Sequence, residues 1–290
     1  MTVVNDVVQG LLLGGLYALF ATGLSLMFGV MRLVNLAHGD LSIAAAFVAL
    51  VTVDALGVNP LLTLALVVPL LFAAGYLLQR GLLNFTLRGG DPLPSLLVTF
   101  GLSVILQNLL LEVFSADSRG LDAGPVEDSG IRITSRLAVG WFPLLTLATG
   151  VAVLAGLQLL LSRTSIGRAF RASSDDPEAA RLMGIDIRHL YAVATGIALA
   201  TVAVAGVFLG IRTTFTPGLG PTRLIFAFEA VIIGGLGSLW GTLVGGLVLG
   251  VAQTLGAQLS PGWGVLAGHL VFLAVLAFRP SGLLGRAVPS

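Results

Sequence analysis

The sequence lacks two residue types on which many protein sites depend. It contains no cysteine among its 290 residues, and its 15 basic residues other than histidine are all arginines. Without cysteine, the chain forms no disulfides and no thiolate metal sites. Without lysine, it cannot contain the GxxxxGK[ST] loop with which many ATPases hold phosphates. If the protein needs energy, that energy would therefore come from a partner or from a gradient.

Charge is also scarce, because charged residues make up 10% of the chain and a soluble domain has about 25%. Hydrophobic residues make up 56%, and the mean hydropathy is +1.01. This composition predicts an integral membrane protein in contact with membrane lipid, with residues 1–290 forming a single transmembrane domain. The net charge of +1 gives no sign of a nucleic-acid partner.

Nine apolar segments have about the length that a helix needs to cross a bilayer core roughly 30 Å thick. Two of them, 36–56 and 223–239, each contain an acid and many small residues. Each could be a broken or re-entrant helix, which is tolerated only where protein covers it. The prediction is an all-α polytopic protein with eight or nine transmembrane helices, nine being preferred. The nine segments are 7–30, 36–56, 61–79, 93–114, 141–162, 190–211, 223–239, 241–259 and 262–279.

The distribution of arginine predicts the orientation, because cytoplasmic loops carry an excess of basic residues. With nine spans, one set of loops holds ten arginines and the other holds five. The first set is predicted to be cytoplasmic, which places the N-terminus outside, the C-terminus inside, a loop at about 163–189 inside and a loop at about 115–140 outside. The first set is Arg32, Arg80, Arg88, Arg163, Arg168, Arg171, Arg181, Arg188, Arg279 and Arg286, and the second is Arg119, Arg132, Arg136, Arg212 and Arg223.

Two stretches resemble each other within the chain. The first and sixth spans each lead through a short polar connection into an acid, Asp40 or Glu229, on a small-residue apolar helix. In the predicted topology the two copies run in opposite directions, which is typical of an inverted repeat. Two ordinary glycine-rich hairpins explain the pattern equally well. The glycines at Gly237, Gly241, Gly246 and Gly250 favour close helix packing, within this chain or across a dimer.

The most polar stretch, residues 167–186, contains a short predicted helix at 177–183. Asp176 can cap its free N–H groups, Pro177 suits its first position and Glu178 favours its positive end. Gly184 is a natural left-handed terminator. Such a helix is too short to persist alone in water, so it must pack on the chain or on a partner. Ala179, Ala180, Leu182 and Met183 offer an apolar surface for this, and the small side chains of Ala179 and Ala180 would admit the close approach of a partner. The alternative is a capped turn that only closes a loop.

The sequence EAARLMG, Glu178–Gly184, matches the EAA-x-x-x-G loop of ABC-importer permeases. In that family the loop forms a coupling helix that docks on a cytoplasmic ATPase, and the resemblance assigns this role to Asp176, Pro177, Glu178, Ala179, Ala180 and Gly184.

Four longer blocks, at 15–41, 162–186, 229–250 and 278–285, resemble the smaller permease subunit of branched-chain amino acid importers. The resemblance implies a multi-pass protein of the bacterial cytoplasmic membrane that translocates leucine, isoleucine and valine. It implies a second, different permease subunit, two ATPase subunits that bind the ATP and a periplasmic or lipid-anchored substrate-binding protein, with no cofactor in this chain. The same branch includes carriers of urea and short amides, which remain an alternative.

Polar residues inside spans are the other site candidates, because charge in a membrane is costly and usually paired or functional. Asn35, His38, Asp40 and Ser42 lie where the first span ends and the second begins. Asp40 would hold a helix break or gate near the pathway, or simply cap the second helix. Glu229 would act in the pathway or in gating, or be the buried partner of an arginine, such as Arg212 or Arg223, or of a residue of the second permease subunit.

A different functional class remains open, namely a gradient-driven secondary transporter or channel without an ATPase. Such a carrier needs ion-coupling acids within its spans, and here only Asp40 and Glu229 qualify. The three histidines are far apart and show no metal-binding spacing, and no GxSxG elbow is present. The sequence therefore predicts neither a metal site nor catalytic residues.

Overall fold

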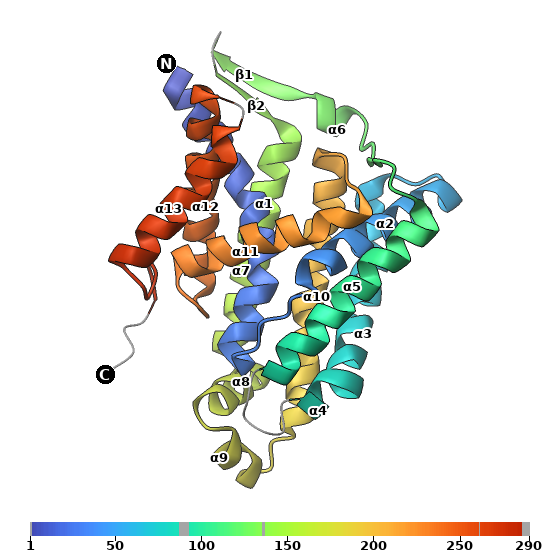
Figure 1. Cartoon of the computed structure of the whole chain (residues 1–290), viewed down its shortest axis with the longest axis vertical. Coiled ribbons are helices and arrows are strands. Elements are labelled where there is room, and N and C mark those ends of the chain that lie inside the picture. Colours follow the sequence, from blue (N-terminus) through green and yellow to red (C-terminus); the bar gives the residue numbers. More distant parts are fainter. Residues whose placement is uncertain (1, 87–92, 135–136, 261, 286–290) are drawn as a thin grey trace.

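Long apolar helices dominate the computed structural model, which describes residues 2–86, 93–134, 137–260 and 262–285 (Figure 1). Within these residues, seven helical segments are long and apolar enough to cross a membrane. One of them, Pro60–Thr86, joins four labelled parts into a continuous helix with a π-helical turn, η2, near its end. The seven are α1 (Thr2–Met31), α2 (His38–Leu56), η1 (Pro60–Thr63) with α3 (Leu64–Leu78), η2 (Gln79–Leu83) and α4 (Asn84–Thr86), α5 (Leu93–Phe114), α7 (Trp141–Arg163), α10 (Ile187–Arg212) and α12 (Leu239–Leu259).

Two further apolar helices are shorter. α11 (Gly220–Gly234) has 15 residues and α13 (Trp263–Phe278) has 16. At 1.5 Å per residue they extend only about 22–24 Å, less than the core of a bilayer. α11 runs transversely across the molecule between α13 and α5 (Figure 1). The nine predicted spans therefore all correspond to helices, and the doubtful segment 223–239 is a short helix followed by a turn at the left-handed Gly235 and Gly237.

Two of the helices begin inside the protein. α1 ends at Met31, the chain turns back through residues 32–37, and α2 begins at a fully buried His38 that contacts Phe20 in the middle of α1. In the same manner, α10 ends at Arg212, the chain passes through η4 (Pro217–Leu219), and α11 begins beside Gly39 of α2. Interrupted helices are viable here because protein surrounds them.

The helices are arranged as two similar sets that run in opposite directions. The first is α1, α2, α3 and α5, and the second is α10, α11, α12 and α13. α12 packs along α1 and α3 packs along α10, while α5 contacts α2 and α13 contacts α11. α1 and α10 lie against each other and run in opposite directions. This arrangement is that of an inverted repeat, with the two helix breaks facing each other at its centre.

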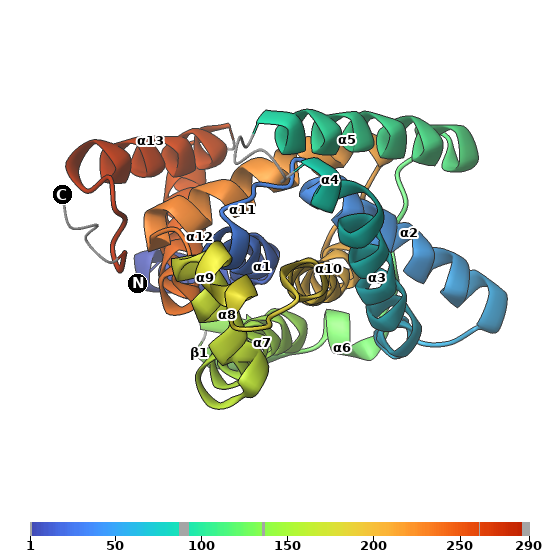
Figure 2. The same ribbon diagram turned by 90° about the horizontal axis from the view of Figure 1, so that it is seen from below.

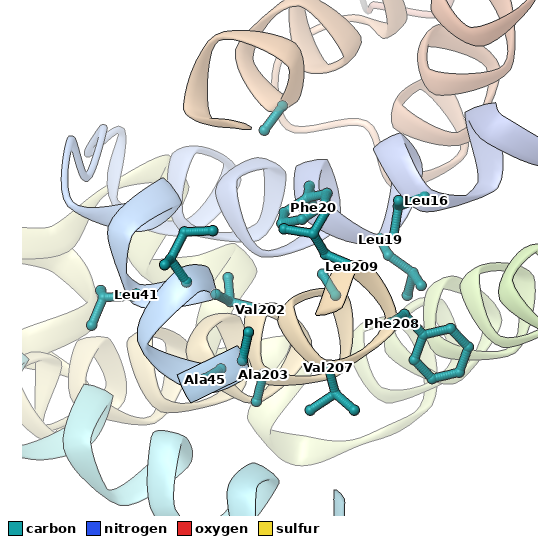
Figure 3. Close-up of a cluster of buried hydrophobic side chains, with 14 of the residues drawn as sticks. Leu16, Leu19, Phe20, Leu41, Ala45, Val202, Ala203, Val207, Phe208 and Leu209 are labelled. Atoms are coloured by element: carbon teal, nitrogen blue, oxygen red, sulfur yellow. The ribbon is translucent and has the colours of Figure 1, made fainter. Parts of the chain in front are cut away.

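The main hydrophobic core lies where α1, α2 and α10 meet. Figure 3 shows Phe20 of α1, Leu41 and Ala45 of α2 and Val202 and Leu209 of α10 in one cluster. Seen from below, α5, α11 and α13 lie along one side of the molecule and α7 lies on the other (Figure 2). α5 and α7 bury little of their surface within this chain, so their apolar faces are available to lipid or to another subunit.

Glycines allow the closest helix contacts. A Cβ on Gly246 of α12 would lie 2.8 Å from the carbonyl oxygen of Gly14 on α1, and Gly250 meets Gly10 one turn further along. Gly241 packs in the same way against Gly234 of α11. The predicted small-residue packing at Gly241, Gly246 and Gly250 is therefore used within this chain.

The loops form two distinct ends of the molecule. A hairpin of β1 (Gly130–Thr134) and β2 (Leu137–Gly140), with Ile131 paired to Val139, lies at one end together with α6 (Pro125–Asp128) and the start of α1. The helices α8 (Ser165–Asp175) and α9 (Pro177–Leu182) lie at the opposite end (Figure 1). We call these the hairpin end and the α9 end. The described residues of the loops 115–140 and 163–189 thus lie at opposite ends of the molecule, and which end is cytoplasmic stays a prediction. Of the arginines used for the orientation, Arg88, Arg136 and Arg286 lie outside the described residues.

We predict that Gly246→Ala destabilises the protein by about 1–3 kcal/mol, because the added methyl group overpacks the contact of α12 with α1. The control is Gly156→Ala in α7, where an added Cβ meets nothing within 4 Å and alanine favours the helix by about 1 kcal/mol. Thermal unfolding of the detergent-purified protein measures both changes. Equal unfolding temperatures for the two variants would contradict the packing argument.

Candidate functional site

The loop helix predicted near the middle of the chain is present as α9. Oδ1 of Asp176 accepts hydrogen bonds from the backbone N–H groups of Glu178 (2.9 Å) and Ala179 (3.0 Å), and Pro177 occupies the first turn. Gly184 has a φ of 85° and open space around it, so it is required for its backbone conformation. The predicted cap, first position and terminator are confirmed. The helix ends at Leu182, with Met183 as its C-cap.

The exposed apolar face of α9 agrees only in part with the predicted one. Ala180 is buried with 3% exposure, so it packs on the chain and is not part of a free surface, contrary to the expectation. Leu182 and Met183, the two larger members of the predicted surface, are 89% and 84% exposed. These two side chains form the exposed apolar surface at the end of α9.

The sequence analysis did not anticipate α8, which precedes α9. Its buried residues Gly167, Phe170 and Ser173 recur every three residues and form the inner face of an amphipathic helix. Ser174 donates a hydrogen bond of 2.8 Å to the carbonyl of Gly29 near the end of α1. α9 is also followed directly by α10, whose start is capped by Asp186. The α8–α9 unit is thus attached to both α1 and α10.

The first helix break brings together the predicted residues Asn35, His38 and Ser42, all fully buried. Asn35 accepts a hydrogen bond from the N–H of Ala37 (3.0 Å), and Nε2 of His38 donates to the carbonyl of Phe20 (2.9 Å). Ser42 donates to the carbonyl of Gly39 (2.6 Å). These side chains supply hydrogen bonds to backbone groups near the break, which buried polar groups require.

Asp40 is fully buried in the first turn of α2. The prediction that it caps this helix is wrong, because Ala37 is the N-cap and no side chain caps α2. Oδ2 of Asp40 accepts a hydrogen bond of 2.5 Å from Ser103 on α5, and Gln107 in turn donates to Ser103 (3.0 Å). The carboxyl group therefore connects the start of an interrupted helix to a neighbouring helix, and it still lies at the favourable end of the helix dipole.

The start of α11 lies directly against this acid. A Cβ added at Gly220 would collide with Oδ1 of Asp40, and one added at Gly39 would collide with the carbonyl of Gly220. Oδ1 is buried and has no hydrogen-bond partner among the described residues. The two interrupted helices thus meet at a contact that only glycine permits on either side, with one carboxylate oxygen held between them.

Glu229, the other predicted acid, pairs with a residue that the sequence did not indicate. Its Oε1 contacts Nδ1 of His269 on α13 in a hydrogen bond that is also an ion pair when the imidazole is protonated. The expected arginine partners Arg212 and Arg223 do not pair with it. Nine residues along α11 separate Glu229 from Gly220, or about 13 Å, so the two acids occupy separate sites.

Further polar groups lie near Glu229. Tyr17 of α1 donates a hydrogen bond of 2.5 Å to Gln253 of α12, and Arg212, Arg223 and Glu229 lie near the Tyr17 hydroxyl group. Within the described part of the chain, Nη1 of Arg212, Nε of Arg223, Oε2 of Glu229 and Nε2 of Gln253 are buried without hydrogen-bond partners. Buried polar and charged groups of this kind need water or a ligand as a hydrogen-bond partner. This cluster has little signal in the sequence, because its members are isolated polar residues in separate apolar helices.

Interrupted helices that meet inside a bundle of long apolar helices, with a buried acid on each of them, define a multi-pass membrane protein of the transporter type. Comparison with known proteins specifies the class further. Residues 7–277 match a family model described as the permease component of branched-chain amino acid transport systems. The chain belongs to this family.

Relatives align with the chain along almost its whole length. The high-affinity branched-chain amino acid transport system permease protein BraD of Pseudomonas aeruginosa is 33% identical over 97% of this chain and 95% of its own length. The corresponding protein LivH of Escherichia coli is 31% identical over 96% and 94%. A probable LivH of Methanocaldococcus jannaschii is 29% identical over 93% and 89%.

We predict that Ser103→Ala lowers both transport and thermal stability, because it removes the hydrogen-bond donor of a buried carboxylate. Leaving such an acceptor unsatisfied costs about 1–3 kcal/mol or more. The double variant Asp40→Asn/Ser103→Ala should recover part of the stability, since a neutral amide is cheaper to bury. Stability that falls further in the double variant would contradict a carboxylate held by Ser103.

We predict that Glu229 and His269 are energetically coupled. Separate Glu229→Gln and His269→Gln changes should each destabilise the protein, and the double variant should lose less than their sum by about 0.5–3 kcal/mol. Gln258→Ala in α12 serves as a comparison, because the side chain of Gln258 donates a hydrogen bond to Asp6 near the hairpin end and not to Glu229 or His269. Additive effects of Glu229→Gln and His269→Gln on the unfolding free energy would show that the contact contributes nothing.

Proposed function

We propose that this protein is the permease subunit of an ABC importer that moves branched-chain amino acids across the bacterial cytoplasmic membrane. The observation that carries the proposal is the alignment with permeases of such systems over more than 90% of the chain. The helix α9, at the position of the EAA-x-x-x-G motif, supports it independently. In this proposal the chain binds no ATP, and ATP binding and hydrolysis occur in partner subunits.

The proposed assembly has one further, different permease subunit, two cytoplasmic ATPase subunits and a periplasmic or lipid-anchored binding protein. The α9 end faces the cytoplasm, because the loops there belong to the set with more arginines. The hairpin end faces outward and is the side available to the binding protein. Leucine, isoleucine and valine are the expected substrates, since the relatives are named for branched-chain amino acids.

Coupling follows from how α9 is attached. The exposed Leu182 and Met183 provide an apolar contact for the ATPase, while the buried Ala180 and the capped start fix α9 to the chain. Because α8 bonds to α1 and α9 leads into α10, a displacement of α9 acts on the first helix of both repeats. Those two helices lead into the breaks that meet at Asp40 and Gly220, so their relative movement would switch the access of the pathway between the two sides.

We predict that the double variant Leu182→Gln/Met183→Gln weakens co-purification of the ATPase subunits and abolishes substrate-stimulated ATP hydrolysis. The change leaves α9 folded, because both side chains point away from the chain and glutamine is a good helix former. The control is Ile166→Gln on α8, which removes an exposed apolar residue at the same end without touching α9. Pull-down of the complex and ATPase assays in proteoliposomes measure both.

Two outcomes would contradict the proposal. Unchanged ATPase recovery and stimulation in the double variant would remove α9 from the coupling contact. Uptake of leucine by proteoliposomes that contain this chain but no ATPase would favour a gradient-driven carrier instead.

A further inference from the structure

A cavity of about 1070 Å³ opens at the α9 end, between the start of α10, α9, η2 and the connection from α1 to α2. Its lining includes four arginines, Arg32, Arg80, Arg181 and Arg188, all exposed. None of them is within 4.0 Å of a carboxylate of the described residues. The lining also contains Asp186, but this carboxylate accepts the backbone N–H groups of Arg188 and His189 as a helix cap. The cavity is therefore strongly basic.

Hydrogen bonds hold the wall of the cavity in place. Asn84 donates to the carbonyl of Arg188 (3.2 Å) and accepts from the buried Gln79 (3.1 Å). The hydroxyl group of Tyr76 accepts a hydrogen bond from Arg80 (2.7 Å) and is also bonded to Nδ1 of His189 (2.9 Å). These contacts orient the side chains of Arg80 and His189 in advance and fix the backbone at Arg188, which lowers the entropy lost when the cavity binds a ligand.

Two departures from regular backbone geometry occur at the same cavity. Arg32 has a positive φ of 51°, which is costly for a residue with a side chain, and Arg80 lies in the π-helical turn Gln79–Leu83. Both kinds of feature are concentrated at functional sites. Each of them here carries an arginine that lines the cavity.

The surroundings of the cavity are apolar. On the helices that border it, Leu77 is 65% exposed, Leu82 is 41% exposed and Leu97 is 71% exposed. A small soluble anion would contact the arginines but not these leucines, whereas an amphiphilic ligand can contact both. The depth of the cavity in the membrane also agrees with a lipid ligand, because the cavity lies at the ends of membrane-spanning helices, where lipid headgroups are found.

We propose that this cavity binds the phosphate headgroup of an anionic phospholipid from the leaflet at the α9 end, with the acyl chains lying along α3 and α5. Arginines form paired hydrogen bonds with phosphate oxygens. Since Pro177 and Arg181 of α9 also line the cavity, the lipid contacts the helix proposed to couple transport to ATP hydrolysis. The binding of lipid does not depend on that coupling role.

Native mass spectrometry of the purified transporter, titrated with phosphatidylglycerol or phosphatidylcholine, tests this proposal. Wild-type protein should retain phosphatidylglycerol in preference to phosphatidylcholine. Arg80→Gln/Arg188→Gln should lower the affinity for phosphatidylglycerol by roughly tenfold or more. Arg80→Lys/Arg188→Lys should keep most of it, because the charge remains. The matched control is Arg163→Gln/Arg168→Gln, which removes two arginines from the same end outside the cavity and should leave the preference unchanged.

Three results would overturn the proposal. The first is wild-type protein that shows no preference for phosphatidylglycerol over phosphatidylcholine. This result overturns the proposal whether or not the glutamine variant folds. Binding of inorganic phosphate or glycerol 3-phosphate that requires Arg80 and Arg188, without retention of phosphatidylglycerol, identifies a site for a soluble phosphate. Loss of the ATPase subunits from Arg80→Gln/Arg188→Gln, with the lipid preference intact, identifies a protein contact.

Discussion

The contact between the start of α2 and the start of α11 determines much of the rest of the structure. Gly39 and Gly220 bring two helix ends together inside the protein, and Asp40 lies between them. Helices that begin inside a membrane protein leave backbone N–H groups without helical partners, and lipid cannot supply any. The surrounding helices must therefore enclose both breaks. The packing of α1 on α10, of α12 on α1 and of α3 on α10 provides this enclosure.

The same constraint accounts for the distribution of buried polar groups. Each interrupted helix carries one buried acid, and this acid is bonded to the last helix of its own repeat: Asp40 to Ser103 on α5, and Glu229 to His269 on α13. The two sites are not equivalent in depth, since Asp40 lies in the first turn of α2 and Glu229 lies well along α11. A hydroxyl group bonds the first acid and a titratable imidazole bonds the second, so only the second contact can become an ion pair.

Sequence reasoning succeeded where a feature depends on local chemistry. Long apolar runs were enough to place the helices, and Asp176, Pro177 and Gly184 were enough to define α9, because caps and terminators act over a few residues. Sequence reasoning failed where a feature depends on contacts between distant parts of the chain. Glu229 and His269 are 40 positions apart, so their pairing cannot be inferred from local sequence. The prediction that Asp40 caps α2 missed its hydrogen bond with Ser103 on another helix, and the burial of Ala180 depends on how α9 packs on the rest of the chain.

The attachment of α9 explains why so short a helix can transmit force. Six residues do not form a stable helix alone, so α9 exists only through its cap, its terminator and the burial of Ala180. A load applied at Leu182 and Met183 cannot be absorbed by bending a long flexible loop, because α8 precedes α9 immediately and α10 follows after four residues. It passes to α1 through Ser174 and Gly29 and to α10 through the chain itself. Since α1 and α10 lead into the two breaks, the contact at Asp40 and Gly220 is where a relative shift of the repeats must appear.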